Sequence, residues 1–326
     1  MLRQLLLAIA VSMISFELVR QSGILHQFPP PLFGPPSLVN LFGGMIFGFG
    51  MVLAGGCVVG VLYKAGSGSL PALLALAGLL AGSFFYSFIH PLWLALAKAL
   101  AFPTRAISLS ELLGISPAFL VLPTGLALLA LCLAWGRKGL MTRLHTPEGY
   151  IQPWQTACVT ALAGTASLAL VGMPLGITTS YGKLAASTVS AFNPKVVASL
   201  EYFSAVPLNY VPPFAGTTVT GGTGPAWDGI AAVQYPLIGG IFLGSAISAV
   251  SLNEWALRST IPWKQAISAT VGGVIMGFAA RMAPACNIWH LLGGIPFLAL
   301  QSLLFVAGLF PGAWLGSRML RKLVMN

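Results

Sequence analysis

Long runs without a charged residue dominate the hydrophobic pattern of this chain. Each run is longer than the roughly 20 apolar residues that a helix needs to cross a bilayer. Backbone polar groups find no partner in lipid, so such runs fold as helices, and they lack the period-two alternation of barrel strands. The runs are residues 21–63, 65–97, 112–136, 149–182, 229–253 and 282–317.

The runs predict an all-α polytopic membrane protein with eight to nine transmembrane helices, in which residues 1–326 form a single integral membrane domain. Composition agrees, because 57% of residues are hydrophobic and only 7% are charged, against roughly a quarter charged in a soluble domain. So few charges cannot cover a water-soluble surface. The eight predicted crossings are residues 2–20, 38–63, 69–97, 116–136, 154–172, 232–252, 264–291 and 296–317.

Positive charge is in excess, with 16 Lys and Arg against 6 Asp and Glu, a formal charge of +10. Most basic residues lie at the ends of predicted helices, which indicates membrane topology and no nucleic-acid partner, with attraction of anions as the second possibility. The two densest clusters, Arg137–Arg143 and Arg318–Lys322, therefore belong in the cytoplasm, and both termini with them. The first segment lacks a small-residue cleavage site, so we interpret residues 2–20 as a retained helix.

The stretch from Gly172 to Ala231 does not predict a long helix, because it is rich in Pro, Gly and amphipathic aromatic residues. A structureless loop of this length is uncommon in a compact protein. We expect short re-entrant or interfacial helices, which are tolerated at membrane depth where they pack on protein or line a wet cavity.

An internal repeat is the most informative feature. Residues 43–57, GGMIFGFGMVLAGGC, align without gaps with residues 272–286, GGVIMGFAARMAPAC, and seven of the fifteen positions are identical. The predicted topology gives the two copies opposite directions, which predicts an inverted repeat with a site near the bilayer midplane. Repeat one covers approximately residues 2–97 and repeat two approximately 232–317, linked by residues 98–231.

Both copies end in a helix-breaking sequence that carries a cysteine. Gly55-Gly56 precedes Cys57, and Pro284-Ala285 precedes Cys286. Gly and Pro interrupt helices, so each segment is predicted to form two half-helices. The free N–H groups of a half-helix N-terminus stabilise an anion or a thiolate. The remaining cysteines, Cys132 and Cys158, lie in apolar helices and are interpreted as small buried hydrophobes.

Further candidates for the substrate path are polar or charged residues near these breaks or in apolar runs, and each has a structural alternative. His290 lies on the same helical face as Cys286 and is equally well explained by packing. Intramembrane charges point to function unless they snorkel. The sequence offers no zinc-site pattern, and no metal or cofactor is expected. The predicted path residues are Cys57, Cys286, Gly56, Asn287, His290, Thr178, Thr179, Arg281, Lys64 and Lys183, with Glu254 and Arg258 as a structural pair equivalent to Glu17 and Arg20.

Together these segments resemble a known family. The motifs GFGMVLAGGCVVGVLYKAGSG at 48–68, GITTSYGKLA at 176–185 and GGVIMGFAARMAPACNIWHLLGG at 272–294, with Glu254 and Arg258, are similar to the YeeE/YedE family of bacterial inner-membrane sulfur transporters. The resemblance implies a non-enzymatic transporter in which thiosulfate passes along a central path by hydrogen bonding to cysteine thiols. It implies Cys57 and Cys286 as relay thiols, and a TusA-like soluble sulfur-carrier protein as a cytoplasmic partner.

The second motif departs from the family pattern. Its Pro-Ala-Cys-Asn replaces the commoner Gly-Gly-Cys or Arg-Gly-Cys, and Trp289 and His290 stand where small residues are usual. The expected substrate is therefore thiosulfate or a related sulfur-containing anion. The alternative from another class is a transmembrane thiol-disulfide electron conduit that uses Cys57 and Cys286, although the chain has no Cys-x-x-Cys motif.

Overall fold

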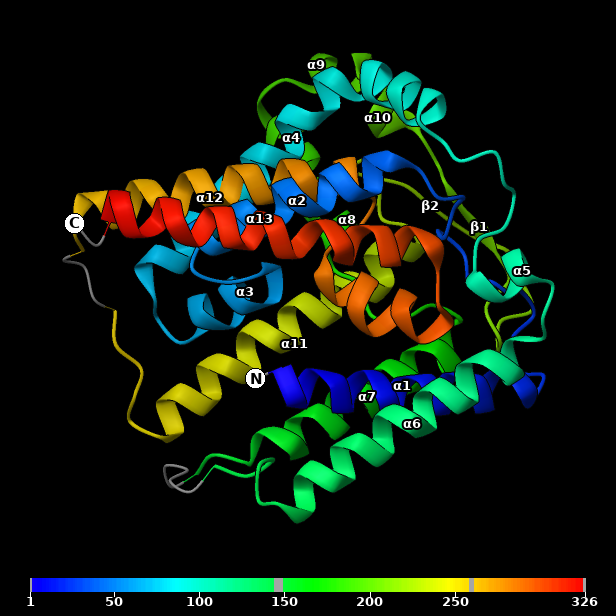
Figure 1. Cartoon of the computed structure of the whole chain (residues 1–326). Helices are drawn as coiled ribbons and strands as arrows, with labels where there is room; N and C mark the ends of the chain where they lie inside the picture. Colours follow the sequence, from blue (N-terminus) through cyan, green and yellow to red (C-terminus); the bar gives the residue numbers. More distant parts are fainter. Residues whose placement is uncertain (1, 144–148, 258–260, 325–326) are drawn as a thin grey trace.

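A computed structural model of the chain describes residues 2–143, 149–257 and 261–324. Helices dominate it, and most of the long ones lie roughly side by side (Figure 1). The α-helices are α1 (Leu2–Gln21), α2 (Leu38–Leu53), α3 (Val58–Gly66), α4 (Leu70–Ala99), α5 (Leu109–Leu113), α6 (Pro117–Arg137), α7 (Pro153–Val171), α8 (Thr178–Phe192), α9 (Pro194–Ser199), α10 (Glu201–Ser204), α11 (Gly229–Ser251), α12 (Trp263–Met282) and α13 (Leu300–Val324).

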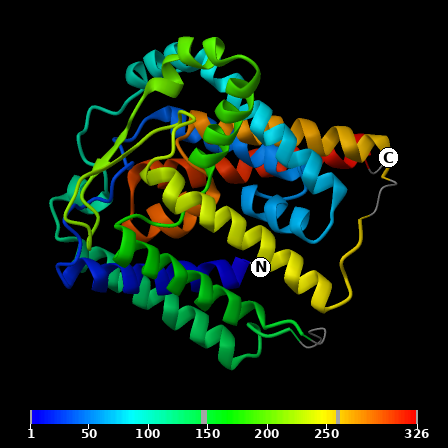
Figure 2. The same ribbon diagram turned by 180° about the vertical axis from the view of Figure 1, so that it is seen from behind.

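Two groups of helices make up the core. In one, α2 packs on both α12 and α13, while α12 packs on α4; in the other, α1 packs on α6 and α7. The view from behind shows α11 running diagonally across the molecule (Figure 2). The predicted first helix is confirmed, and its buried side chains include Phe16 and Met13.

Side chains that bond to free backbone amides set several helix starts. Ser37 and Asn40 form a capping box at α2, in which each side chain bonds to the other residue's backbone. Asp228 caps the start of α11, and its carboxylate accepts a hydrogen bond from the Ala231 amide at 3.0 Å. This cap fixes the residue at which the irregular segment ends and α11 begins.

The segment from Gly172 to Ala231 contains the predicted short helices, namely α8, α9 and α10. It also contains a small antiparallel pair that the all-α prediction missed, β1 (Leu208–Tyr210) and β2 (Val219–Gly221), in which Leu208 pairs with Gly221. Three-residue strands give almost no periodic signal in a sequence.

Seven segments of the described chain are long and apolar enough to cross a membrane, which makes this a multi-pass membrane protein. The prediction of eight to nine is therefore met only in part. The predicted crossing without a counterpart among these seven is residues 264–291. It corresponds to α12, whose 20 residues include Lys264, Gln265 and Arg281 and are less apolar. The seven segments are α1, Leu38–Gly66, α4, α6, α7, α11 and α13.

Glycines bring α2 and α13 into direct backbone contact. A methyl group added at Gly44 would meet the Phe305 carbonyl, and one added at Gly308 would meet the Leu41 carbonyl. Small residues permit such close approach between membrane helices, where packing drives association.

The same kind of contact joins α12 to α4. Gly273 faces the Ala75 carbonyl, and Gly78 faces the Thr270 carbonyl. The helices α2 and α12 then meet each other through Gly43, which lies against Ala283, and Gly272, which lies against Ala54. Both cysteine segments therefore follow directly from helix ends that are held by glycine contacts.

Replacing Gly44 by Ala is expected to destabilise the protein by about 1–3 kcal/mol, because the added methyl overlaps the backbone of α13. Gly240 is the matched control, since it lies within α11 and has nothing within 4 Å of an added methyl. Gly240→Ala should leave stability unchanged or raise it, because Ala is the better helix former. Thermal unfolding of both variants in detergent measures this, and equal midpoints would contradict the packing argument.

Candidate functional site

Cys57 lies at the joint between α2 and α3. The turn is made by Gly55, which has a left-handed φ of +74°. Cys57 then caps α3, and its sulfur accepts a hydrogen bond from the Gly60 amide at 3.3 Å. Lys64 donates to the Gly55 carbonyl at 2.6 Å, so this predicted path residue bonds to the turn itself.

Cys286 occupies the corresponding joint after α12. The chain leaves α12 at Met282 and turns at Ala285, which has an unusual φ of +117°. The His290 amide donates to the Cys286 carbonyl at 3.1 Å, so Cys286 begins the helical segment that follows. A π-helix from Trp289 to Gly294 follows, and such helices often mark functional sites.

Cys286 packs in one buried cluster with Ala54 and Val58, which flank the joint that carries Cys57. Cys57 is half-buried and Cys286 is fully buried, and neither forms a disulfide. Tyr181 belongs to the same buried cluster. The segments that carry the two cysteines are therefore packed against each other, although they lie more than 200 residues apart in the sequence.

The predicted neighbours of Cys286 are buried polar groups with unused hydrogen-bonding capacity. His290 stacks on Phe305 with ring centres 4.0 Å apart, and its Nδ1 bonds to Ser302 at 2.9 Å. Its Nε2 and the Asn287 Oδ1 are buried without a partner among the described residues. At the first joint, directly before Cys57, the Gly56 amide donates to the Met51 carbonyl at 3.0 Å.

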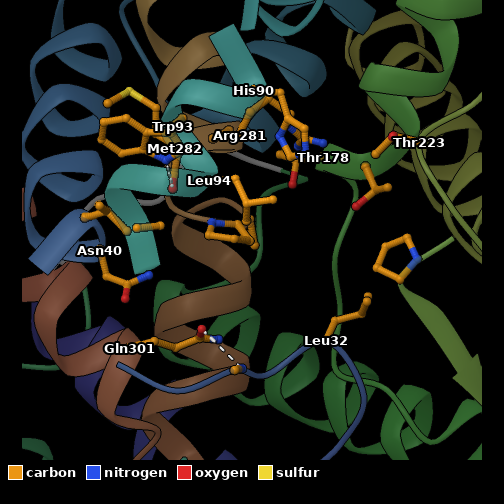
Figure 3. Close-up of a pocket in the computed structure, with 18 of the residues that line it drawn as sticks. Leu32, Asn40, His90, Trp93, Leu94, Thr178, Thr223, Arg281, Met282 and Gln301 are labelled. Carbon is orange, nitrogen blue, oxygen red and sulfur yellow. Dashed lines mark hydrogen bonds between the residues drawn. The ribbon is translucent and has the colours of Figure 1, made fainter. Parts of the chain in front are cut away.

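A cavity of about 620 Å³ lies beside the second joint. Pro284, Ala285 and Trp289 line it, whereas neither cysteine does. Figure 3 shows Arg281 and Thr178 on one side of the cavity and Gln301 with Leu32 on another. An anion in this cavity would thus lie next to Pro284 and Ala285, which directly precede Cys286, without contacting the thiol itself.

Three predicted path residues contribute to the cavity wall, namely Thr178, Thr179 and Arg281. The two threonines begin α8, whose first-turn amides have no partner within the helix. Arg281 is 7% exposed and donates to the Tyr202 hydroxyl at 3.3 Å. No carboxylate of the described residues pairs with it, and its Nε has no partner there.

Lys183 lies outside this cavity and is paired. Its side chain is fully buried, and its ammonium lies 2.7 Å from the Asp228 carboxylate and 2.7 Å from the Gly224 carbonyl. Burial acts to raise the pKa of Asp228, but hydrogen bonds from Lys183 and two backbone amides outweigh it and hold this pKa below its ordinary value. The pair links α8 to the start of α11.

The structure describes one of the two predicted acid–arginine pairs in full. Glu17 and Arg20 form an ion pair at 2.6 Å. In the second copy Glu254 accepts a hydrogen bond from the Tyr150 hydroxyl. Its predicted partner Arg258 lies outside the described residues.

Several cavity residues were not identified from the sequence. They are aromatic or amide side chains that, taken singly, resemble ordinary helix residues. The amphipathic aromatics of the irregular segment were the one available signal, and Tyr202 was among them. The missed residues are Tyr86, His90, Trp93, Gln234 and Gln301.

Comparison with known proteins assigns the chain to a recognised group. Residues 1–315 match the family model described as Sulphur transport. A thiosulfate transporter, TsuA, of Spirochaeta thermophila is 29% identical over 94% of this chain and 85% of its own length. TsuA of Escherichia coli is 26% identical over 96% of this chain and 82% of its own. The probable transporter YedE of Escherichia coli is 34% identical over 25% of this chain and 20% of its own.

Replacing Asp228 by Asn should lower the stability of the protein by about 3–5 kcal/mol, because it leaves the Lys183 charge buried without a counterion. The double variant Lys183→Met, Asp228→Asn should recover part of this loss. Glu201→Gln, at an exposed acid, is the control. Thermal unfolding in detergent measures all three, and an unchanged midpoint for Asp228→Asn would contradict a structural role for the pair.

Proposed function

This chain belongs to the Sulphur transport family, and on that premise we propose that it carries thiosulfate or a related sulfur-containing anion across a membrane. It acts as a transporter and not as an enzyme, as the names of its relatives imply. The observation that carries the proposal is the placement of Cys57 and Cys286, each directly after a turn that ends a helix.

The relay works by replacing hydration. An anion of charge −2 is costly to move into hydrocarbon, and helix N-termini with their free amides offset part of that cost. A thiol S–H is a weak donor that suits the terminal sulfur of thiosulfate, which holds water less tightly than oxygen. The substrate then passes between Cys57 and Cys286 through successive hydrogen bonds, with Gly56, Asn287 and His290 beside them.

We also propose that the two cysteine segments form an inverted repeat around a pseudo-twofold axis. Reciprocal glycine contacts support it. Gly43 lies against Ala283 and Gly272 against Ala54, so the contact is repeated when the two copies exchange roles. The contacts of α2 with α13 and of α12 with α4 correspond in the same way.

In this proposal the chain spans a bacterial inner membrane with both termini in the cytoplasm, as the clusters Arg137–Arg143 and Arg318–Lys322 favour. A TusA-like sulfur carrier receives the sulfur on that side. No ATP-binding motif is present in the sequence, so a gradient or consumption of the sulfur inside supplies the driving force.

The variants Cys57→Ala and Cys286→Ala should each abolish uptake of labelled thiosulfate into proteoliposomes, with little change in thermal stability. Losing a small thiol interrupts the relay but leaves only a minor cavity. Cys132→Ala and Cys158→Ala are the matched controls and should retain most uptake. Equal loss in all four variants would indicate a folding defect and contradict the relay.

The thiol-disulfide conduit makes the opposite prediction for the same pair. A relay needs both thiols free, whereas a conduit must pass through a disulfide between Cys57 and Cys286. Thiol labelling and mass spectrometry during turnover distinguish them, and a Cys57–Cys286 disulfide that accumulates and decays with electron transfer would overturn the transport proposal.

A further inference from the structure

We propose that the 620 Å³ cavity beside Cys286 is an oxyanion site in which the side-chain N–H groups of Arg281, Trp289 and Gln301 bind the oxygen atoms of a sulfur oxyanion. The proposal rests on the proposed function. It adds a binding site for the anion outside the two thiols and states that the protein holds the anion there by its oxygen atoms.

Unsatisfied donors carry the argument. Arg281, Trp289 and Gln301 line one cavity and are 7%, 4% and 3% exposed. Each keeps a buried N–H without a partner among the described residues, namely Nε, Nε1 and Nε2. A buried polar group without a partner costs free energy. All the unpartnered buried side-chain atoms in the described lining are donors, so the cavity suits a ligand that supplies only acceptors.

Each donor is held in place by a second contact. The Gln301 Oε1 accepts from the Gly34 amide at 3.4 Å, which leaves Nε2 as the free end of the side chain (Figure 3). The indole of Trp289 stacks on Phe33 with ring centres 4.9 Å apart. The Arg281 guanidinium donates to Tyr202 through another nitrogen. Donors held in this way lose little side-chain freedom on binding.

The charge of the wall favours an anion. Arg281 and Lys98 line the cavity, and none of the described lining residues is acidic. Glu201, which does not line it, interacts electrostatically with His90. The N-terminus of α8 also reaches the wall at Thr178 and Thr179 and adds partial positive charge.

The donor set also defines the ligand class. N–H groups bind oxygen strongly and sulfur weakly, so the cavity recognises the oxygen end that thiosulfate, sulfite and sulfate share. Recognition of the terminal sulfur is then left to the thiols. The cavity should therefore bind sulfate as well as thiosulfate, although only the latter suits the relay.

Binding to the purified full chain in detergent tests the site. Isothermal titration calorimetry with thiosulfate and sulfate as probes should give dissociation constants within about tenfold of each other, and chloride should bind far more weakly. Trp289→Phe keeps a ring on Phe33 and removes only the N–H. It should weaken binding of both probes by about ten- to a hundredfold, as expected for a hydrogen bond to a charged group.

Two further variants complete the design. Gln301→Glu keeps the acceptor for Gly34 but replaces the donor by a carboxylate, so it should abolish binding. Trp93→Phe is the matched control, because Trp93 lines the same cavity but its Nε1 already donates to the Met282 carbonyl at 2.9 Å. It should change affinity by less than about threefold. Thermal unfolding without ligand confirms that each variant is folded.

Unchanged affinity in both donor variants, equal weakening in Trp93→Phe, or equal binding of chloride would overturn the oxyanion site. The readout is separate from transport. Folded donor variants that take up thiosulfate with the wild-type KM would overturn the site and leave the relay standing. A wild-type protein that binds thiosulfate through these donors but takes up none would overturn the transport proposal and leave the site standing.

Discussion

Direct backbone contact between glycine-bearing helices is the constraint on which the rest of the structure depends. Where Gly44 meets Phe305 and Gly273 meets Ala75, no side chain separates the helices. Lipid gives helices no hydrophobic reason to associate, so such close packing is what holds α2, α4, α12 and α13 together. Because α2 and α12 end directly before the cysteine joints, their contacts also fix where the two thiols lie.

The sequence predicted the features that depend on composition and local pattern. Apolar runs predicted most of the long helices, and the helix breaks before Cys57 and Cys286 followed from Gly-Gly and Pro. The crossing count was less accurate, because α12 carries Lys264 and Arg281 and gains its stability from packing that hydropathy does not measure. Three-residue strands were missed for a related reason, since their pairing is set by tertiary contact.

The cavity had no comparable signal. Its wall combines residues as distant as Trp93 and Gln301, and which polar atoms stay unpartnered is a property of the packed structure alone. The partner of Lys183 is likewise determined by the packed structure and not by the local sequence. Its charge in an apolar run suggested a substrate contact, but whether a buried lysine has a counterion depends on how Asp228 is placed by the cap of α11.

Lys183 and Arg281 differ in how their buried charge is compensated. Both are buried, but Lys183 has a carboxylate at 2.7 Å whereas Arg281 has a tyrosine hydroxyl and no acid among the described residues. A protein that needed Arg281 only for packing would gain stability by pairing or removing it, because an uncompensated buried charge is costly. A transient anion compensates that charge only while it is bound. In the proposed oxyanion site, the unpaired guanidinium is therefore compensated by an anion that enters and leaves, and not by a permanent partner.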